Sequence, residues 1–251
     1  MKCSNPLVAY TNHVNGKNYL LLFRFLKNEK NLEKLKQDVK DGKQVIIPCG
    51  DCFCCRANKA KEWTIRNVFE SRKYDNNIFL TLTYDEKNCP TFLSKAHLIN
   101  FIKLLRTHLV RYKHYKEKIK YFACGEYGGK FGRPHYHLII YNLALDDCVC
   151  ISDNNYVSPL IGSCWKYGIH SIGFINEKSI SYVSGYTQKK INKTLSSSER
   201  KKLEQWLIEH KQTSFQNGFI LASKGIGKEF YDKNNDMYDK GYFIYHTTGN
   251  T

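Results

Sequence analysis

Two β-rich segments joined by a short glycine-rich link constrain the fold of this chain most strongly. The sequence IKYFACGEY occupies residues 119–127, PHYHLIIY occupies residues 134–141, and GGKFGR lies between them. Short runs of β-branched and aromatic residues bounded by glycine are typical of strands, and a link of this length predicts a β-hairpin. We therefore expect an antiparallel sheet at the centre of the fold.

The second strand of this hairpin carries two histidines on one face. Residues two apart on a strand point to the same side, so His135 and His137 share a face. The pairing also allows Glu126, on the first strand, to lie on that face. Two imidazoles and one carboxylate leave coordination positions open for a substrate, which suits Mn²⁺ or Mg²⁺ near a phosphate, and zinc also fits the ligand types. A pair of surface histidines on an open sheet face is an equally good interpretation of the HxH pattern alone.

The remaining periodicities predict an α+β fold. We expect helices at 56–74, from Ser94 to Tyr112, at 177–193 and at 198–211, and further strands at 78–86 and 166–175. This order predicts a central antiparallel sheet with helices packed on one face. We divide the chain into an N-terminal cysteine-rich segment (1–56), a core (57–195) and a C-terminal helical extension (196–251).

The predicted helix at 177–193 carries two tyrosines that suit nucleophilic chemistry. Tyr182 and Tyr186 are four residues apart and therefore share a helical face, which Lys190 continues with Lys189 beside it. A phenol oxygen can form a covalent intermediate, and a nearby cation favours its ionised form. Without the histidines, half-buried packing residues would be the better interpretation of the two tyrosines.

Cysteines gather in the segment PCGDCFCCR at residues 48–56. Cys49, Cys52 and Cys55 follow CxxCxxC spacing, and Cys3 is a candidate fourth thiolate. Four such ligands fit a structural Zn²⁺ site, and an iron–sulfur cluster also needs about four cysteines. A reduced cysteine-rich turn without metal is the remaining alternative.

Charge and hydropathy indicate the class of partner. The chain has 39 Lys and Arg against 23 Asp and Glu, a net charge of +16, which favours a polyanion such as nucleic acid. Tyrosines interleaved with lysines at 111–121 fit single strands, because bases stack on aromatic rings. No apolar run approaches a membrane span, so we expect no membrane association and a location in the cytoplasm.

The motifs FLTLTY, GEYGGKFGRPHYHLIIY and YVSGYTQKK, in this order, resemble those of the HUH endonuclease superfamily, whose core is RRM-like. PCGDCFCCRANKAKEWTIR and SKGIGKEFYDKN narrow the resemblance to the replication initiation proteins of gokushoviruses, which are small single-stranded DNA phages of the microvirus family. The resemblance covers most of the chain. It departs from the family pattern at Cys54, which blurs the cysteine spacing.

The resemblance implies a metal-dependent nickase that acts on a single-stranded DNA origin in the host bacterial cytoplasm. His135, His137 and Glu126 would hold the metal, and Tyr182 or Tyr186 would form a 5′-phosphotyrosine and leave a 3′-OH primer for rolling-circle replication. Host polymerase would extend the primer, the enzyme would rejoin the strand at termination, and a host helicase would unwind the duplex because the chain has no GxxxxGK[ST] phosphate loop. The alternatives are a relaxase or transposase of the same superfamily and a noncatalytic DNA-binding regulator.

Overall fold

The structure is a computed structural model that divides into two units. It describes residues 2–14, 17–26, 30–112, 114–115, 117–128, 133–186, 205, 208–209 and 218–233. The N-terminal unit comprises the described residues up to Glu62, and the larger unit comprises those from Trp63 onward. Helix α2 (Phe53–Ser71) contributes its first turns to the first unit and the remainder to the second.

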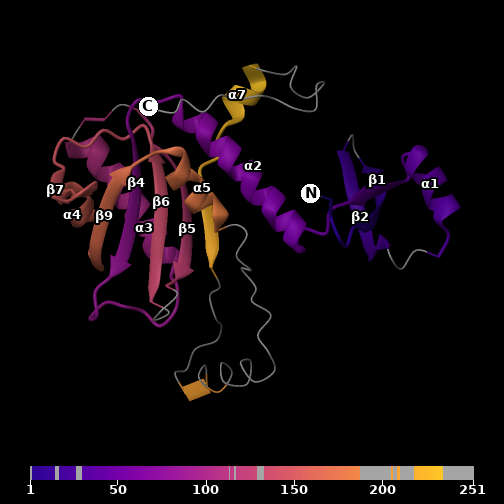
Figure 1. The fold of residues 1–251 in the computed structure, drawn as a ribbon, viewed down its shortest axis with the longest axis horizontal. Helices are drawn as coiled ribbons and strands as arrows, with labels where there is room; N and C mark the ends of the chain where they lie inside the picture. Colours follow the sequence, from indigo (N-terminus) through magenta and orange to yellow (C-terminus); the bar gives the residue numbers. More distant parts are fainter. Residues whose placement is uncertain are drawn as a thin grey trace. The chain divides into compact units, whose positions relative to one another are not determined.

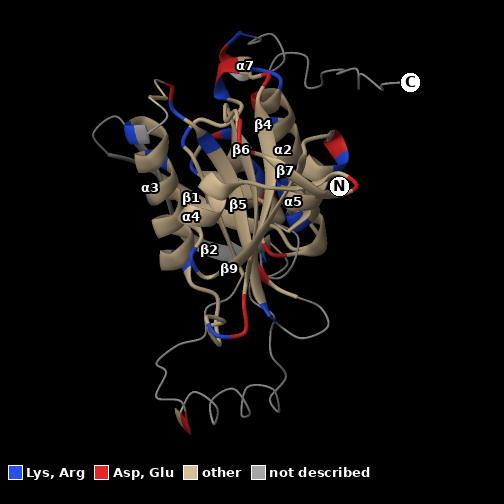
Figure 2. Cartoon of the chain, turned by 90° about the vertical axis from the view of Figure 1, so that its left-hand side faces the viewer, with Lys and Arg blue, Asp and Glu red and all other residues tan. Residues whose placement is uncertain are grey.

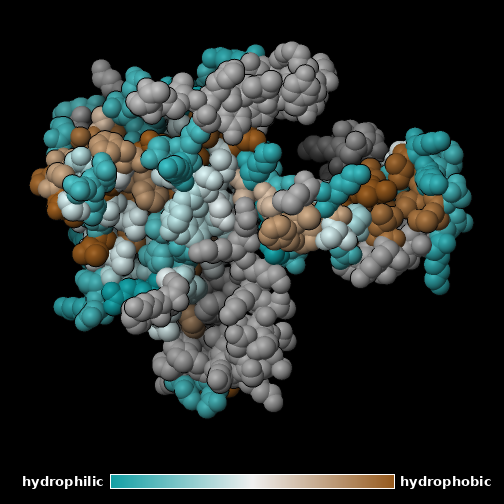
Figure 3. Space-filling view, in the orientation of Figure 1, coloured by the Kyte–Doolittle hydropathy of each residue, from teal (hydrophilic) through white to brown (hydrophobic). Residues whose placement is uncertain are grey.

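The N-terminal unit is a small sheet with one helix. Strands β1 (Leu7–Val14), β2 (Lys17–Phe25) and β3 (Gln44–Ile47) pair in the order β2-β1-β3, and α1 (Leu32–Lys40) precedes β3 (Figure 1). The Asn31 side chain accepts a hydrogen bond from the backbone N–H of Lys34 and so caps α1. This unit also exposes hydrophobic surface (Figure 3), including Leu32 and Ile46. The sequence predicted only its cysteine-rich character.

The larger unit is built on a seven-stranded antiparallel sheet. Its strands are β4 (Asn77–Tyr84), β5 (Lys120–Tyr127), β6 (Pro134–Tyr141), β7 (Val149–Ser152), β8 (Asn155–Val157), β9 (Gly168–Phe174) and β10 (Phe219–Ala222). They lie in the order β10-β5-β6-β4-β9-β8-β7, so the histidine strand β6 is in the interior between β5 and β4. The predicted α+β class and the predicted β5–β6 hairpin are confirmed.

Helices cover both faces of this sheet, rather than one face as the sequence predicted (Figure 1). On one face, Tyr136 and Leu138 of β6 pack with α3 (Lys95–Tyr112) and α4 (Pro159–Cys164). On the other, Ile139 and Tyr141 pack with α2 and α5 (Glu177–Gly185). The physical reason is that β6 is apolar on both sides, so each face loses exposed apolar surface when a helix covers it.

The helix that carries the two tyrosines is confirmed in its first part. Helix α5 begins after Asn176, whose side chain accepts from the backbone N–H of Ser179 while the Ser179 hydroxyl accepts from the backbone N–H of Asn176. The helix is described as far as Gly185, with Tyr186 as its C-cap, and the remainder of the predicted range lies outside the described residues. In the predicted helix 198–211, only residues 205, 208 and 209 are described, and they are helical.

Two elements near the C-terminus were not predicted. Strand β10 pairs with β5 at the edge of the sheet, and α7 (Lys228–Lys233) follows it. Glu229 of α7 forms an ion pair with Lys73, and acidic and basic residues alternate along this short helix (Figure 2). Within the described part of the chain, no helix is long and apolar enough to cross a membrane.

Candidate active site and metal-ligand clusters

The predicted ligand set at the hairpin comes together in the structure. The strand register places Glu126 of β5 directly opposite His135 of β6, and the ligand atoms of Glu126, His135 and His137 all lie within 4.8 Å of one another. The Oε1 atom of Glu126 lies 2.9 Å from Nε2 of His135 and 3.3 Å from Nε2 of His137. One carboxylate oxygen and two imidazole nitrogens therefore converge on one point at the C-terminal end of β5.

The other ring nitrogen of each histidine has a partner that orients the imidazole. Nδ1 of His135 lies 3.1 Å from the carbonyl oxygen of Arg133, and Nδ1 of His137 lies 3.1 Å from Oγ1 of Thr81. A carbonyl oxygen can only accept, so Nδ1 of His135 carries the proton and donates it. In the neutral imidazole, Nε2 then presents its lone pair to the Glu126 carboxylate. This is the orientation that metal-binding histidines adopt.

Both predicted tyrosines lie beside this ligand set. The ring of His137 stacks on that of Tyr186, with centroids 5.4 Å apart and planes 13° apart, and meets Tyr182 edge-on at 5.4 Å. The two tyrosine rings are 5.0 Å apart. Residues four apart on α5 are therefore brought to the same histidine, as the helical spacing predicted.

The two tyrosines differ in exposure. Tyr182 is 52% exposed, whereas Tyr186 is only 8% exposed. Burial raises the pKa of Tyr186 well above its ordinary value, and side-chain hydrogen bonds with Tyr182 and Glu126 raise it further. Tyr186 is therefore held as a neutral phenol next to the carboxylate, while Tyr182 is accessible to a ligand from solvent.

A buried polar network fixes α5 against the sheet. Nδ2 of Asn67 on α2 donates to Oγ of Ser184 at 3.1 Å, and the Tyr141 hydroxyl donates to Oδ1 of Asn67 at 2.8 Å. Ser184 lies between the two tyrosines in sequence, so the network determines where both rings lie. Sequence reasoning missed Asn67, because nothing in the α2 sequence marks one buried asparagine as a partner of a helix more than 100 residues away.

The predicted lysines Lys189 and Lys190 lie outside the described residues. The glycine-rich segment 224–228, which contains two lysines, is held by the fold itself. The backbone N–H of Gly227 donates to Oε2 of Glu70 at 2.7 Å, and Oε1 of Glu70 lies 2.7 Å from Nζ of Lys120. The carboxylate of Glu70 therefore ties this segment to α2 and β5.

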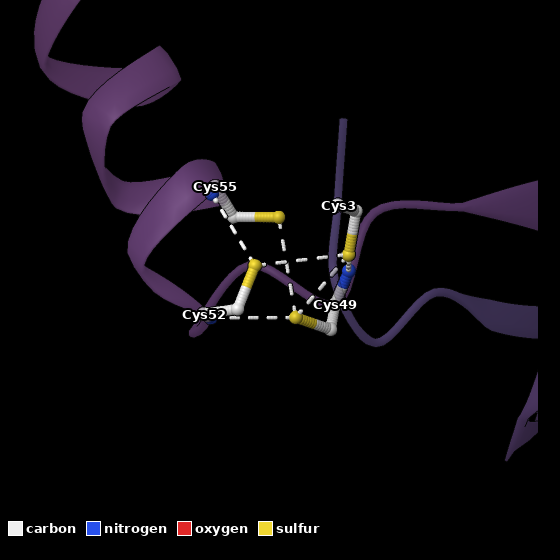
Figure 4. Close-up of side chains that lie close together, drawn as sticks. All are labelled: Cys3, Cys49, Cys52 and Cys55. Atoms are coloured by element: carbon white, nitrogen blue, oxygen red, sulfur yellow. Dashed lines mark hydrogen bonds between the residues drawn. The ribbon is translucent and has the colours of Figure 1, made fainter. Parts of the chain in front are cut away.

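A second ligand cluster lies in the N-terminal unit, where the sulfurs of Cys3, Cys49, Cys52 and Cys55 are all within 4.8 Å of one another (Figure 4). Hydrogen bonds from Ser4 and from the backbone N–H of Cys55 lower the pKa of the Cys52 thiol to about 5. Burial raises the pKa of the Cys55 thiol to about 12. The predicted set of four cysteines is thus brought together.

Comparison with known proteins decides the family. Residues 77–191 match the family model for the replication-associated protein of the ORF2 type. The chain is also 30% identical over 226 residues to "Replication-associated protein VP4" of Bdellovibrio phage phiMH2K, covering 82% of this chain and 72% of that protein. The chain belongs to the replication-associated protein family. Its predicted resemblance to gokushovirus-type replication initiators is confirmed, and a role in DNA replication follows.

Two further relatives are similar to a smaller part of themselves. "Replication-associated protein ORF2" of Spiroplasma virus 4 is 33% identical, and the match covers 77% of this chain and 59% of that protein. "Replication-associated protein ORF4" of Chlamydia phage 1 is 30% identical, with 72% and 50% covered. The chain therefore spans between half and three quarters of the length of these relatives. No solved structure matches the chain.

The segment matched by the replication-associated family model contains the whole histidine–tyrosine site. Glu126, His135, His137, Tyr182 and Tyr186 all fall within residues 77–191, which begin at the first residue of β4. The four cysteines of the second cluster lie before this segment. The two clusters are therefore separate features of this family member.

Proposed function

We propose that this replication-associated protein is a metal-dependent endonuclease that nicks a single-stranded DNA origin through a tyrosine. One observation carries the proposal: a two-histidine, one-carboxylate ligand set lies in ring contact with two tyrosines on the next helix. Ligands for a divalent cation and a candidate nucleophile are the two parts that phosphodiester transfer needs.

The donor atoms fit Mn²⁺ or Mg²⁺. Imidazole nitrogens and a carboxylate oxygen on two adjacent strands leave open positions for phosphate oxygens and water. Nε2 of His135 faces Glu126 at 2.9 Å with its lone pair, an arrangement in which a cation relieves the repulsion between two acceptors. The chemistry that such an ion supplies is Lewis-acid polarisation of a phosphoryl oxygen.

The proposed step exchanges one phosphate ester for another. The hydroxyl oxygen of Tyr182 or Tyr186 forms a bond to phosphorus, the bond from phosphorus to the 3′ oxygen breaks, and the phenol proton ends on that 3′ oxygen. The products are a 5′-phosphotyrosine and a 3′-OH primer. Because the phosphate ester is conserved, the reverse step rejoins the strand without ATP.

The exposure of the two tyrosines supports an order of use. Tyr182 is the more exposed ring and makes the first cut, whereas Tyr186, buried against Glu126, cuts the regenerated origin while the first 5′ end is still held. Lys189 and Lys190 neutralise the charge that develops on the phosphate. Host helicase and polymerase supply the unwinding and synthesis of rolling-circle replication.

A cleavage assay tests the proposal. Purified protein is incubated with end-labelled single-stranded phage DNA and Mn²⁺, with and without EDTA, and the products are separated on denaturing gels. We expect a covalent protein–DNA adduct that requires Mn²⁺ and disappears in the double variant Tyr182→Phe, Tyr186→Phe. The variant Tyr156→Phe, on β8, is the matched control and keeps full activity. Tight DNA binding without an adduct would favour a noncatalytic DNA-binding regulator.

A further inference from the structure

We propose that Cys3, Cys49, Cys52 and Cys55 bind a single structural zinc ion that closes the N-terminal unit. This inference is independent of the proposed nuclease activity, because the cysteines belong to the other unit and to none of the groups at the histidine–tyrosine site. It also decides between the zinc and iron–sulfur alternatives that the sequence left open.

The distances between the sulfurs match those of one tetrahedral ion. A Zn–S bond of about 2.3 Å places the sulfurs of a regular tetrahedron about 3.8 Å apart. The Sγ atom of Cys3 lies 3.5 Å from that of Cys49 and 3.8 Å from that of Cys52, and the Sγ atoms of Cys49 and Cys55 are 3.9 Å apart. The four sulfurs therefore already surround a volume of the size that one zinc ion occupies (Figure 4).

The same distances exclude two other arrangements of these thiols. A disulfide needs about 2.05 Å between sulfurs, and all four cysteines are free. An iron–sulfur cluster distributes its cysteines over different irons, which places those sulfurs farther apart than the ligands of one ion. Four sulfurs within 4.8 Å of one another fit one metal centre.

Backbone amides point at the sulfurs in the manner of a metal-binding turn. The backbone N–H of Asn5 and that of Cys49 donate to Sγ of Cys3, at 3.4 and 3.3 Å. The backbone N–H of Cys52 donates to Sγ of Cys49, and that of Cys55 donates to Sγ of Cys52, each at 3.4 Å. Such donors stabilise thiolate charge and hold each sulfur toward the centre of the cluster.

The position of the four cysteines in the chain explains what the ion would stabilise. Cys3 precedes β1 and Cys49 follows β3, and because Leu7 pairs with Ile47 both lie at the same end of the β1–β3 pair. Cys52 and Cys55 lie at the start of α2. One ion therefore joins three segments, which suits a unit whose sheet is too small to bury a large core.

Cys54 provides a matched control within the same turn. It lies between two proposed ligands in sequence but is not part of the cluster of four sulfurs. We purify the wild type, Cys49→Ser and Cys54→Ser under reducing conditions with added zinc, and measure metal content by native mass spectrometry and elemental analysis. We expect about one zinc per chain in the wild type and in Cys54→Ser, and a loss of at least tenfold in Cys49→Ser.

Cobalt substitution of the wild-type chain keeps the test decisive if Cys49→Ser fails to fold. Co²⁺ at four thiolates gives intense sulfur-to-metal charge-transfer absorption, and we expect this band to disappear on addition of about one equivalent of zinc. The variant Glu126→Gln should leave the band unchanged. A mass equal to the bare polypeptide, several irons per chain, or equal metal loss in Cys54→Ser would overturn the proposal.

Discussion

The Glu126 carboxylate meets His135 across the β5–β6 pair, with 2.9 Å between Oε1 and Nε2. Because Nδ1 of His135 donates to the carbonyl oxygen of Arg133, the neutral ring turns its remaining lone pair toward that carboxylate. A proton or a metal ion between the two groups removes the repulsion, and His137 adds a second nitrogen at 3.3 Å from the same oxygen. The pairing of two strands thus assembles a cation site.

Glu126→Gln tests this cation site directly. The amide keeps the shape of the side chain but removes the negative charge, so we expect Mn²⁺ affinity to fall roughly tenfold to a hundredfold. Isothermal titration calorimetry with Mn²⁺ measures the change. Glu177→Gln, an exposed residue in the first turn of α5, is the control and should bind Mn²⁺ as the wild type does. Unchanged affinity in Glu126→Gln would remove the carboxylate from the ligand set.

Single tyrosine variants test the proposed division of labour. We expect Tyr182→Phe to reduce the first cleavage more than Tyr186→Phe does, because Tyr182 is exposed and Tyr186 is buried. Each single variant should retain partial cleavage, since both rings contact His137. Rates of adduct formation on an origin oligonucleotide give the comparison. Full activity in the double variant would contradict the assignment of both residues.

Ser184→Ala tests the network that positions α5. The change removes the acceptor that Nδ2 of Asn67 uses in a fully buried site, which costs about 1–3 kcal/mol of the free energy of unfolding. Urea unfolding followed by circular dichroism measures this loss. Ser181→Ala lies on the exposed side of the same helix and should stay within about 0.5 kcal/mol of the wild type. Equal stability of the two variants would show that the network contributes little.

The stability of the larger unit should depend on His170 in mildly acidic solution. Nε2 of His170 accepts from the backbone N–H of Ser158 at 3.0 Å, and burial lowers the pKa of the imidazole below its ordinary 6.5. The unfolded chain therefore binds the proton first, and stability present above pH 6.5 is lost as the pH falls through 6.5 toward the lower folded value. Urea midpoints between about pH 8 and pH 5 should fall more steeply for the wild type than for His170→Gln. Parallel profiles would contradict this role.

The candidate site was largely predictable because strand and helix parity are local properties. The spacing of His135 and His137 determined their common face, the short link determined the pairing with Glu126, and the four-residue spacing brought both tyrosines to His137. The predicted metal, the catalytic roles and the lysines at 189 and 190 remain hypotheses.

Long-range pairings were less predictable. The four residues of β10 pair with β5 almost 100 residues earlier, and the N-terminal strands lack a clean alternation of polar and apolar residues. Helices on both faces of the sheet follow from the apolar residues on both sides of β6, a pattern that was read only for its histidines. Asn67 shows the same limit, because its partner Ser184 is close only in the folded chain.

The most direct test of the central proposal is to identify the residue that carries DNA. Adduct formed with Mn²⁺ is digested with nuclease and trypsin, and the modified peptide is sequenced by mass spectrometry. The account predicts a nucleotide linked through its 5′ phosphate to Tyr182 or Tyr186 in the peptide 179–189, and no such peptide in EDTA. A nucleotide on any other residue, or adduct formation that does not need metal, would contradict it.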